Sequence, residues 1–445
     1  RGGGGGAGGA RGFGTRRPPG GGGGGGRPRP APPPPPPRQY DAPLNSDIAG
    51  WAAPNSLWVK SADTPDSVGP FAAEAVRASY GAPGGCASLS LPADSAWSET
   101  TVKGPVLERP ARASVQPTLV EAAAARIRAA KKPVILMGGS TCLDAGVRQA
   151  GRIAATGVRV LTDTFVSRIA RGAGRFAPDK MMYFGEMALA DLEGVDLMVL
   201  VETTEPVAFF AYPDRPSLLV PEGCAVASLC GRETDGVGAL QALADALGAP
   251  EAPPVEGLAL PAMPQGPFNP YSVGASIARH MPDNAIVSDD AVTAGLPVWQ
   301  STKTARPHDW LCLTGGAIGQ GIPVAIGAAV ACPDRKVLSL NGDGAAMYTV
   351  QGLWTIAREQ LDVTTVVFAN HSYRILNIEM GRTGAGNPGP AARKLLDLGE
   401  PRIDWVAVAG GLGLPAERVS TPEAFDEAFE RAMNQKGPRF IEAAL

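Results

Sequence analysis

The sequence predicts an α/β protein built from parallel sheets with helices on both faces (α/β/α), preceded by a disordered tail. Short apolar segments alternate with segments of helical period along the chain, which is typical of parallel sheets. Residues 336–373 form the clearest strand–helix–strand unit. Residues 1–38 hold 16 Gly, 10 Pro and 7 Arg without any acidic residue, so they have too little apolar surface to fold.

Composition excludes several functional classes. Beyond the tail, 407 residues hold 33 basic and 43 acidic side chains, which argues against nucleic acid as a partner. Phe13 is the only aromatic residue before Tyr40, so the tail is interpreted as a solvated low-complexity segment rather than an RNA-binding arm. The apolar stretch 315–332 contains Gln320, Pro323 and five Gly, so no membrane span is expected.

The cysteines and the amino terminus bear on cellular location. Six Cys without a CxxC pair and three widely separated His make a zinc site or a disulfide framework unexpected. A reducing, cytoplasmic location fits best, because the start also lacks the apolar core of a signal peptide. The first residue is not Met, so we expect either a fragment or a mis-joined gene model.

The elements of the first half follow from periodicity. A helix is predicted over 68–80 and a strand over 86–91, and residues 99–116 are predicted to be a linker. The central region alternates helices and strands and ends near residue 247, before a Pro-rich linker at 250–265. Its predicted helices are 117–130 and 144–155, and its predicted strands are 134–137, 158–161, 196–201 and 217–220. Gly138-Gly139-Ser140 lacks the spacing of a dinucleotide loop and predicts a plain strand-to-helix turn.

The last region begins near Pro270 and repeats the alternation. The predicted helices are 271–280, 319–330, 345–359, 404–409 and 421–433. The predicted strands are 285–288, 336–340, 363–369 and 439–442.

The most informative residues stand at the ends of two of these strands. Gly342 and Gly344 permit a tight turn, and the following helix presents free backbone amides to an anionic group. Asp343 lies in the turn and Asn370 ends the next strand, so parallel pairing would bring both together. A carboxylate and an amide oxygen suit octahedral magnesium, with a diphosphate supplying further oxygens.

This arrangement resembles the thiamine diphosphate signature of the acetolactate synthase and benzoylformate decarboxylase family. Residues 315–323 are similar to the family's Gly-rich segment, and residues 288–295 to its early diphosphate-side loop. The resemblance covers the chain after residue 38 and implies the thiamine diphosphate-binding fold. It implies four parts: a low-complexity tail (1–38), the end of a pyrimidine-binding domain (39–100), a linker with the central α/β domain (101–264) and the diphosphate-binding domain (265–445).

The resemblance also implies the roles of individual residues. The magnesium ligands would be Asp343, Asn370 and the backbone carbonyl of Ser372. The other cofactor-binding residues would be Gly342, Gly344, Ala345, Ile318 and Thr293. His371 stands where many relatives have a second Asn, at a position that is not a metal ligand in the family.

Each assignment has a structural alternative. Asp343 could cap a helix and Asn370 a strand end, and Ile318 could be plain helix core. Thr293 stays open between a diphosphate contact and no such contact, and His371 is interpreted as a solvated strand-end residue rather than a catalyst. Some relatives bind flavin in the central domain, but no motif here demands FAD.

The implied activity is thiamine diphosphate- and magnesium-dependent decarboxylation and carboligation of 2-oxo acids, similar to that of acetolactate synthase. A benzoylformate decarboxylase-like activity and a non-catalytic remnant that binds cofactor remain as alternatives. The family's activating glutamate should lie upstream of the part matching 39–100, but the first Glu of this chain is Glu74. We therefore assign no catalytic residue and expect impaired turnover. The resemblance implies a homodimer or homotetramer, and it leaves the particular 2-oxo acid open.

Overall fold

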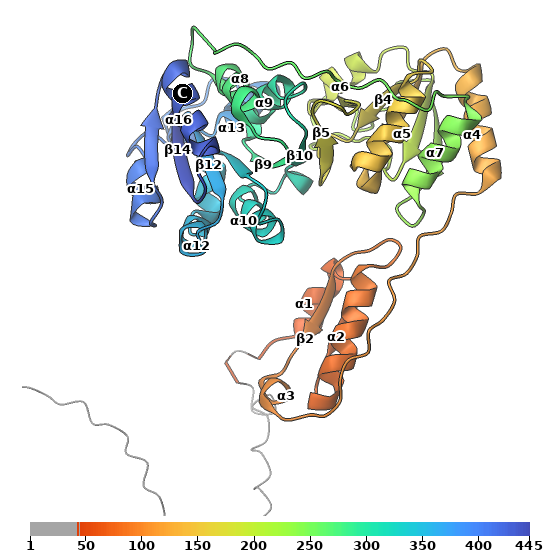
Figure 1. The fold of residues 1–445 in the computed structure, drawn as a ribbon, viewed down its shortest axis with the longest axis horizontal. Helices are drawn as coiled ribbons and strands as arrows, with labels where there is room; N and C mark the ends of the chain where they lie inside the picture. The colour runs from red at the N-terminus through yellow and green to blue at the C-terminus, as the bar shows by residue number, and fades with distance from the viewer. Residues whose placement is uncertain (1–41, 44) are drawn as a thin grey trace, which may run out of the picture. The chain divides into compact units, whose positions relative to one another are not determined.

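The computed structural model describes residues 42–43 and 45–445 (Figure 1). The predicted disordered tail, 1–38, lies outside this range. The described chain divides into two compact units, which are treated separately here. The first unit runs to Ala75 and includes Ala87–Val106, and the second contains Val76–Cys86 and Leu107–Leu445. These units do not test the four-part division, which stays a prediction.

The first unit is a small α/β element. Its strands β1 (Trp58–Ser61) and β2 (Ala87–Ser90) pair in parallel, with Trp58 opposite Ala87. Its helices are α1 (Ile48–Ala52), α3 (Ala93–Trp97) and most of α2 (Pro65–Ser79). The predicted helix 68–80 and strand 86–91 correspond to α2 and β2.

The second unit contains two sheets. The five-stranded central sheet is parallel throughout, in the order β6-β4-β3-β7-β8. Its strands are β3 (Pro133–Met137), β4 (Arg159–Thr162), β6 (Asp179–Lys180), β7 (Leu197–Val201) and β8 (Ala225–Cys230). Its helices are α4 (Pro117–Ala129), α5 (Asp144–Ala154), α6 (Gly185–Asp191) and α7 (Gly236–Ala246).

Both faces of the central sheet are covered, as the alternation of its buried side chains requires. Ile135 and Val199 pack with residues of α4, α5 and α7, whereas Leu136 and Leu200 pack on the opposite face with α6. The predicted strand at 217–220 is wrong. Leu218 makes only an isolated bridge to Val207 there, and the edge strand is β8 instead.

The seven-stranded carboxyl-terminal sheet has the order β13-β14-β12-β11-β9-β10-β5. Its strands are β9 (Ala285–Asp290), β10 (His308–Leu311), β11 (Val337–Gly342), β12 (Val363–Ala369), β13 (Ala416–Val419), β14 (Arg439–Ala444) and β5 (Ile169–Arg171). Its helices are α8 (Pro270–His280), α9 (Gly295–Ser301), α10 (Gly321–Ala331), α11 (Asp343–Ala346), α12 (Gly352–Arg358), α13 (Arg374–Arg382), α14 (Pro390–Leu396), α15 (Trp405–Gly411) and α16 (Pro422–Met433).

Helices cover both faces of this sheet as well, which confirms the predicted α/β/α class. Leu338 and Phe368 pack against α8, α9 and α16, whereas Val337 and Val367 pack against α10, α12 and α15. Burying side chains of this size typically stabilises a fold by about 1.5–3 kcal/mol each. The single helix predicted over 345–359 is instead divided into α11, a 3₁₀ turn (Met347–Thr349) and α12.

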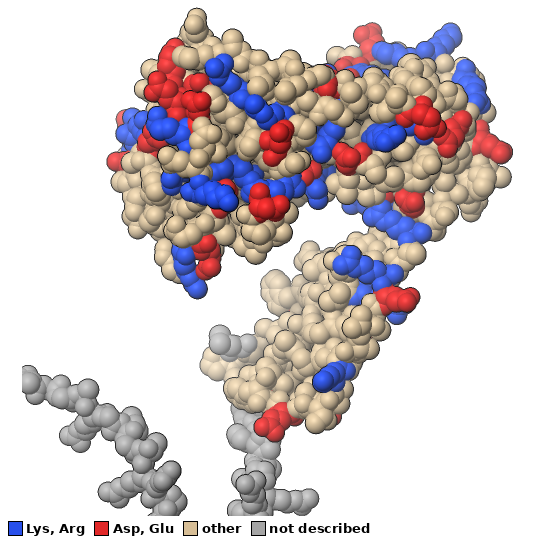
Figure 2. Space-filling model, viewed as in Figure 1, with Lys and Arg blue, Asp and Glu red and all other residues tan. Residues whose placement is uncertain are grey.

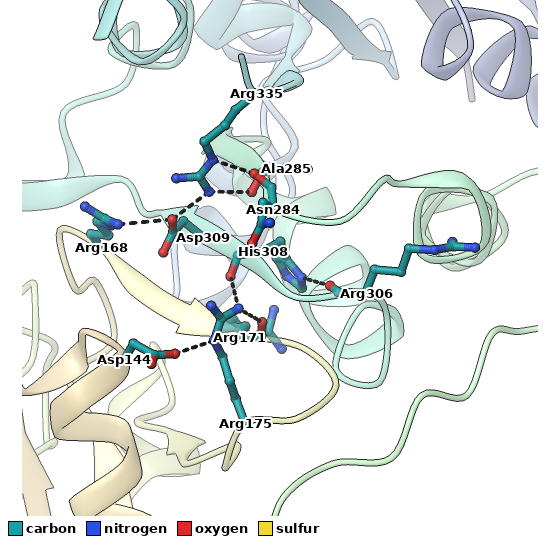
Figure 3. Close-up of polar contacts among 10 residues, drawn as sticks. All are labelled: Asp144, Arg168, Arg171, Arg175, Asn284, Ala285, Arg306, His308, Asp309 and Arg335. Atoms are coloured by element: carbon teal, nitrogen blue, oxygen red, sulfur yellow. Dashed lines mark hydrogen bonds and ion pairs between the residues drawn. The ribbon is translucent and has the colours of Figure 1, made fainter. Parts of the chain in front are cut away.

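Strand β5 comes from the central part of the chain but pairs antiparallel with β10. Figure 3 shows the polar contacts around this junction. Asp309 on β10 accepts hydrogen bonds from Arg168 at 3.1 Å and from Arg335 at 2.7 Å. The buried Arg171 guanidinium lies 3.4 Å from the Trp299 ring centroid, and burial lowers the pKa of Arg171 to about 9. The edge strand of the carboxyl-terminal sheet therefore comes from the central part of the chain.

The surface carries charges of both signs. On the face seen in Figure 2, Lys and Arg are interspersed with Asp and Glu over the larger unit. Within the described residues, no helix has the length and hydropathy that crossing a membrane would require.

Candidate active site

The candidate site lies at the carboxyl ends of β9, β11 and β12. These strands are adjacent and parallel, with Asn341 opposite both Asp290 and Val367. Three loops leave the sheet here, and each carries residues singled out from the sequence. Open parallel sheets bind ligands at this edge.

Asp343 follows β11 directly and is the first residue of α11. One of its carboxylate oxygens accepts the Gly344 N–H at 2.9 Å, and the other accepts the His371 N–H at 2.7 Å. The residue is 3% exposed, and burial raises the pKa of its carboxyl. No Lys or Arg among the described residues forms an ion pair with it. Asp343 is thus a buried acid whose carboxylate is held by two backbone amides.

Asn370 follows β12 and is half-buried. Its side-chain oxygen accepts the Ser372 N–H at 3.0 Å, which turns the chain back toward Asp343. Ser372 in turn forms an antiparallel bridge with Asp397, and its carbonyl accepts the Arg374 N–H. The hydrogen bond from His371 to Asp343 therefore brings the turn that contains Asn370 and Ser372 to the end of β11.

The Gly-rich segment lies beside this pair. Asp290, the last residue of β9, accepts the N–H groups of Gly319 at 2.8 Å and Gly321 at 3.1 Å. It thereby fixes the loop that leads into α10. Burial raises the pKa of Asp290 to about 6, and its second carboxylate oxygen is buried with no hydrogen-bond partner among the described residues. The family resemblance of residues 288–295 includes Asp290 but implies no role for it.

Ile318 and Thr293 lie in loops rather than in regular helix. Ile318 is half-buried and precedes α10, which begins at Gly321, so it does not belong to the interior of that helix. Thr293 is half-buried in a 3₁₀ turn, Val292–Ala294, that contacts β11. Within the described residues, neither side chain hydrogen-bonds to Asp343 or Asn370.

Helix α13 continues from the Asn370 turn and is anchored on the central part of the chain. Arg382 forms an ion pair with Glu186 on α6, and the Tyr212 hydroxyl donates to Glu379 at 2.8 Å. Arg382 also lies over the rings of Phe184 and Tyr212. These contacts fix the far end of the helix that leaves the candidate site.

The oxygen ligands and backbone N–H groups at this site suit a divalent cation that is bound together with an anion. The carboxylate, amide and carbonyl oxygens of the turns at 343 and 370–372 are hard ligands. The amides of Gly344 and Ala345 belong to the first turn of α11, where backbone N–H groups lack helical partners. Among the described residues there is no cluster of three or more His, Cys, Asp or Glu of metal-binding geometry.

Comparison with known proteins adds independent observations. Residues 290–443 match the model for "Thiamine pyrophosphate enzyme, C-terminal TPP binding domain". The chain is 44% identical over 411 residues to "Putative acetolactate synthase large subunit IlvX" of Mycobacterium tuberculosis, covering 92% of this chain and 79% of that protein.

Other similarities are shorter or structural. The chain is 31% identical over 186 residues to acetolactate synthase isozyme 1 large subunit of Escherichia coli, covering 40% of this chain and 31% of that protein. Among solved structures, it resembles a thiamine diphosphate-dependent 4-hydroxybenzoylformate decarboxylase of Rhodococcus jostii, with a TM-score of 0.76 and 23% identity. That match covers 92% of this chain and 80% of the other, and it shows a common fold.

Proposed function

Because the chain belongs to the thiamine diphosphate-dependent enzyme family, we propose that it decarboxylates and joins 2-oxo acids in a reaction dependent on thiamine diphosphate and magnesium. The proposed activity is similar to that of acetolactate synthase. The observation that carries this proposal is the meeting of Asp343 with the 370–372 turn at the ends of two neighbouring strands.

The residues present fit the cofactor's diphosphate and its metal ion. Asp343 is 3% exposed, and burial raises its pKa because the charged carboxylate is poorly solvated. A cation beside it would stabilise this charged form. In the proposed assignment, Asp343, Asn370 and the Ser372 carbonyl hold magnesium. Gly342, Gly344, Ala345 and Thr293 contact the diphosphate.

Thiamine diphosphate bound here would supply a nucleophilic carbon and an electron sink for the decarboxylation of a 2-oxo acid. The task of this chain is to orient that group and to exclude water. Ile318, half-buried in the loop before α10, is proposed to support the cofactor's bent shape. His371 acts here through its backbone, since its N–H holds Asp343.

Several finer features belong to the same proposal. We infer the four-part division at residues 38, 100 and 264, a homodimer or homotetramer, and a cytoplasmic location. The impaired turnover expected from the sequence stays a prediction that measurement of carbon dioxide release tests.

The deciding experiment measures cofactor binding separately from turnover. The purified chain is titrated with thiamine diphosphate in a calorimeter, with magnesium and with EDTA, as wild type, Asp343→Ala and Asp334→Ala. Asp334 is an exposed acid in the turn before β11 and serves as the control. We expect binding that requires magnesium in wild type and Asp334→Ala, and none in Asp343→Ala. Equal binding by Asp343→Ala would refute the proposal.

A decarboxylase that protonates its product is the second candidate. It is favoured by 29% identity over 178 residues to benzoylformate decarboxylase of Pseudomonas aeruginosa. Incubation with pyruvate, 2-oxobutyrate and benzoylformate separates the two. A carboligase yields acetohydroxy acids from the first two substrates, and a decarboxylase yields the aldehyde of its preferred substrate.

A further inference from the structure

The central sheet has its own point of reversed strand order, separate from the sheet that carries the candidate active site. From β3 the chain proceeds outward to β4 and β6 on one side, and β7 and β8 lie on the other side. The crevice of such a sheet opens at the carboxyl ends of the two strands where the order reverses, here β3 and β7. Gly138-Gly139-Ser140 follows β3 and Glu202 follows β7.

Glu202 fills this crevice with its own carboxylate. One oxygen accepts the Ser140 N–H at 2.6 Å. The other accepts the Ser140 hydroxyl at 2.7 Å, Arg112 at 2.7 Å and the N–H of Gly236, the first residue of α7, at 3.1 Å. The Glu202 side chain is 0% exposed, whereas that of Arg112 is 39% exposed.

The surrounding backbone is shaped around the carboxylate. Glu202 itself has a φ of 51°, a left-handed conformation that is uncommon for residues other than Gly. A Cβ at Gly236 would lie only 2.8 Å from the Glu202 carboxyl carbon, and Gly139 has a φ of 54°. The chain therefore accepts an unfavourable backbone conformation at Glu202 and uses two glycines to admit its head group.

The donors gathered here are those of a phosphate site. Backbone N–H groups at a strand-to-helix turn and at a helix amino terminus, a hydroxyl and a guanidinium are the usual ligands of nucleotide phosphates. In this chain all four contact a carboxylate of the protein itself.

We propose that the central domain contains a phosphate-binding site that Glu202 occupies in cis, so that phosphorylated ligands are excluded until this carboxylate is removed. Two adjoining cavities, of about 660 and 630 Å³, share Glu202 in their walls. The larger cavity is lined by the acidic residues Asp163, Glu205 and Glu233 and by the basic residue Arg232. The excess of acidic side chains also disfavours the binding of an anion.

The experiment measures binding of inorganic phosphate to the full chain at constant ionic strength, with chloride as the balancing anion. Glu202→Gly removes the carboxylate and relieves the left-handed backbone. Glu202→Gln is the matched control, since it fills the same space without charge. We expect at least about tenfold tighter phosphate binding by Glu202→Gly than by wild type or Glu202→Gln. Adding Arg112→Ala to Glu202→Gly should reverse the gain.

Two outcomes would overturn the proposal. One is a folded Glu202→Gly variant, verified by circular dichroism, that binds phosphate no better than wild type. The other is wild-type protein that already binds phosphate and loses that binding on Arg112→Ala, because Glu202 would then not exclude the anion. The second measurement needs no Glu202 variant, and Arg112 is exposed enough for its replacement to leave the core intact.

Discussion

The carboxylate of Asp343 accepts the backbone N–H of His371 at 2.7 Å and so connects the carboxyl ends of β11 and β12. The acid proposed to bind magnesium is therefore positioned by the same turn that carries its proposed partners. Sites organised in this way need little rearrangement to bind their ligand.

Replacement of Asn370 tests the second proposed ligand. Asn370→Ala removes the side-chain oxygen, so magnesium affinity at saturating thiamine diphosphate should fall roughly 10- to 100-fold. Asn370→Asp keeps an oxygen at that position and should retain most of the affinity. Calorimetric titration with magnesium measures both. Unchanged affinity in Asn370→Ala would exclude Asn370 as a ligand.

His371 tests the backbone of the same turn. Its φ of 54° is left-handed, which β-branched residues adopt with difficulty. His371→Val should lower the free energy of unfolding by about 1–3 kcal/mol. His371→Gly should remain within about 1 kcal/mol of wild type. Urea unfolding gives both values, and a Val variant as stable as the Gly variant would contradict this account.

A pair of glycines tests the Gly-rich segment. Gly319 has a φ of 95°, and an added Cβ would lie 2.6 Å from the Cβ of Tyr348, whereas Gly327 on α10 has open space around it. Gly319→Ala should therefore lower the free energy of unfolding by at least about 1 kcal/mol. Gly327→Ala should raise it by about 0.5–1 kcal/mol. Thermal unfolding compares them, and the same sign for both changes would be inconsistent with the observed loop.

The raised pKa of Asp290 leads us to expect that the stability of the fold depends on pH. Burial raises the pKa of Asp290 to about 6, so the folded chain binds this proton more tightly than the unfolded chain. Its contribution to stability is complete below about pH 3.8 and is lost as pH rises through about 6. Asp290→Asn keeps an acceptor for Gly319 and Gly321 without the charge.

The Asn variant should therefore gain up to about 3 kcal/mol over wild type at pH 7.5, and much less at pH 4.5. Urea unfolding at the two pH values measures this difference, with Asp334→Asn as the exposed control. A gain that is equal at both pH values would show that Asp290 does not titrate in this range.

The candidate site could be located from the sequence because its main residues lie close together along the chain. The segment Val337–Ala369 carries its own strand–helix–strand signal, and parallel pairing then brings residues 343 and 370 to one edge. The interruption of the helix at Met347–Thr349 was not predicted, since its apolar spacing continues through the break.

Long-range features were beyond sequence reasoning. Strand β5 has three residues, and its partner β10 lies far along the chain, so neither periodicity nor length identifies it. The sequence predicts only a plain turn at Gly138-Gly139-Ser140, and no local pattern singles out Glu202. Only the pairing of β3 with β7 brings that carboxylate to the turn.

The origin of strand β5 determines how this chain responds to cleavage between its central and carboxyl-terminal parts. The Pro-rich segment at 250–265 separates β5 from every other strand of the carboxyl-terminal sheet. A protease that cuts there is expected to produce a nicked protein rather than two free pieces, because the amino-terminal piece still supplies the edge strand beside β10. Expression of residues 265–445 alone would expose that edge, and open strand edges promote self-association.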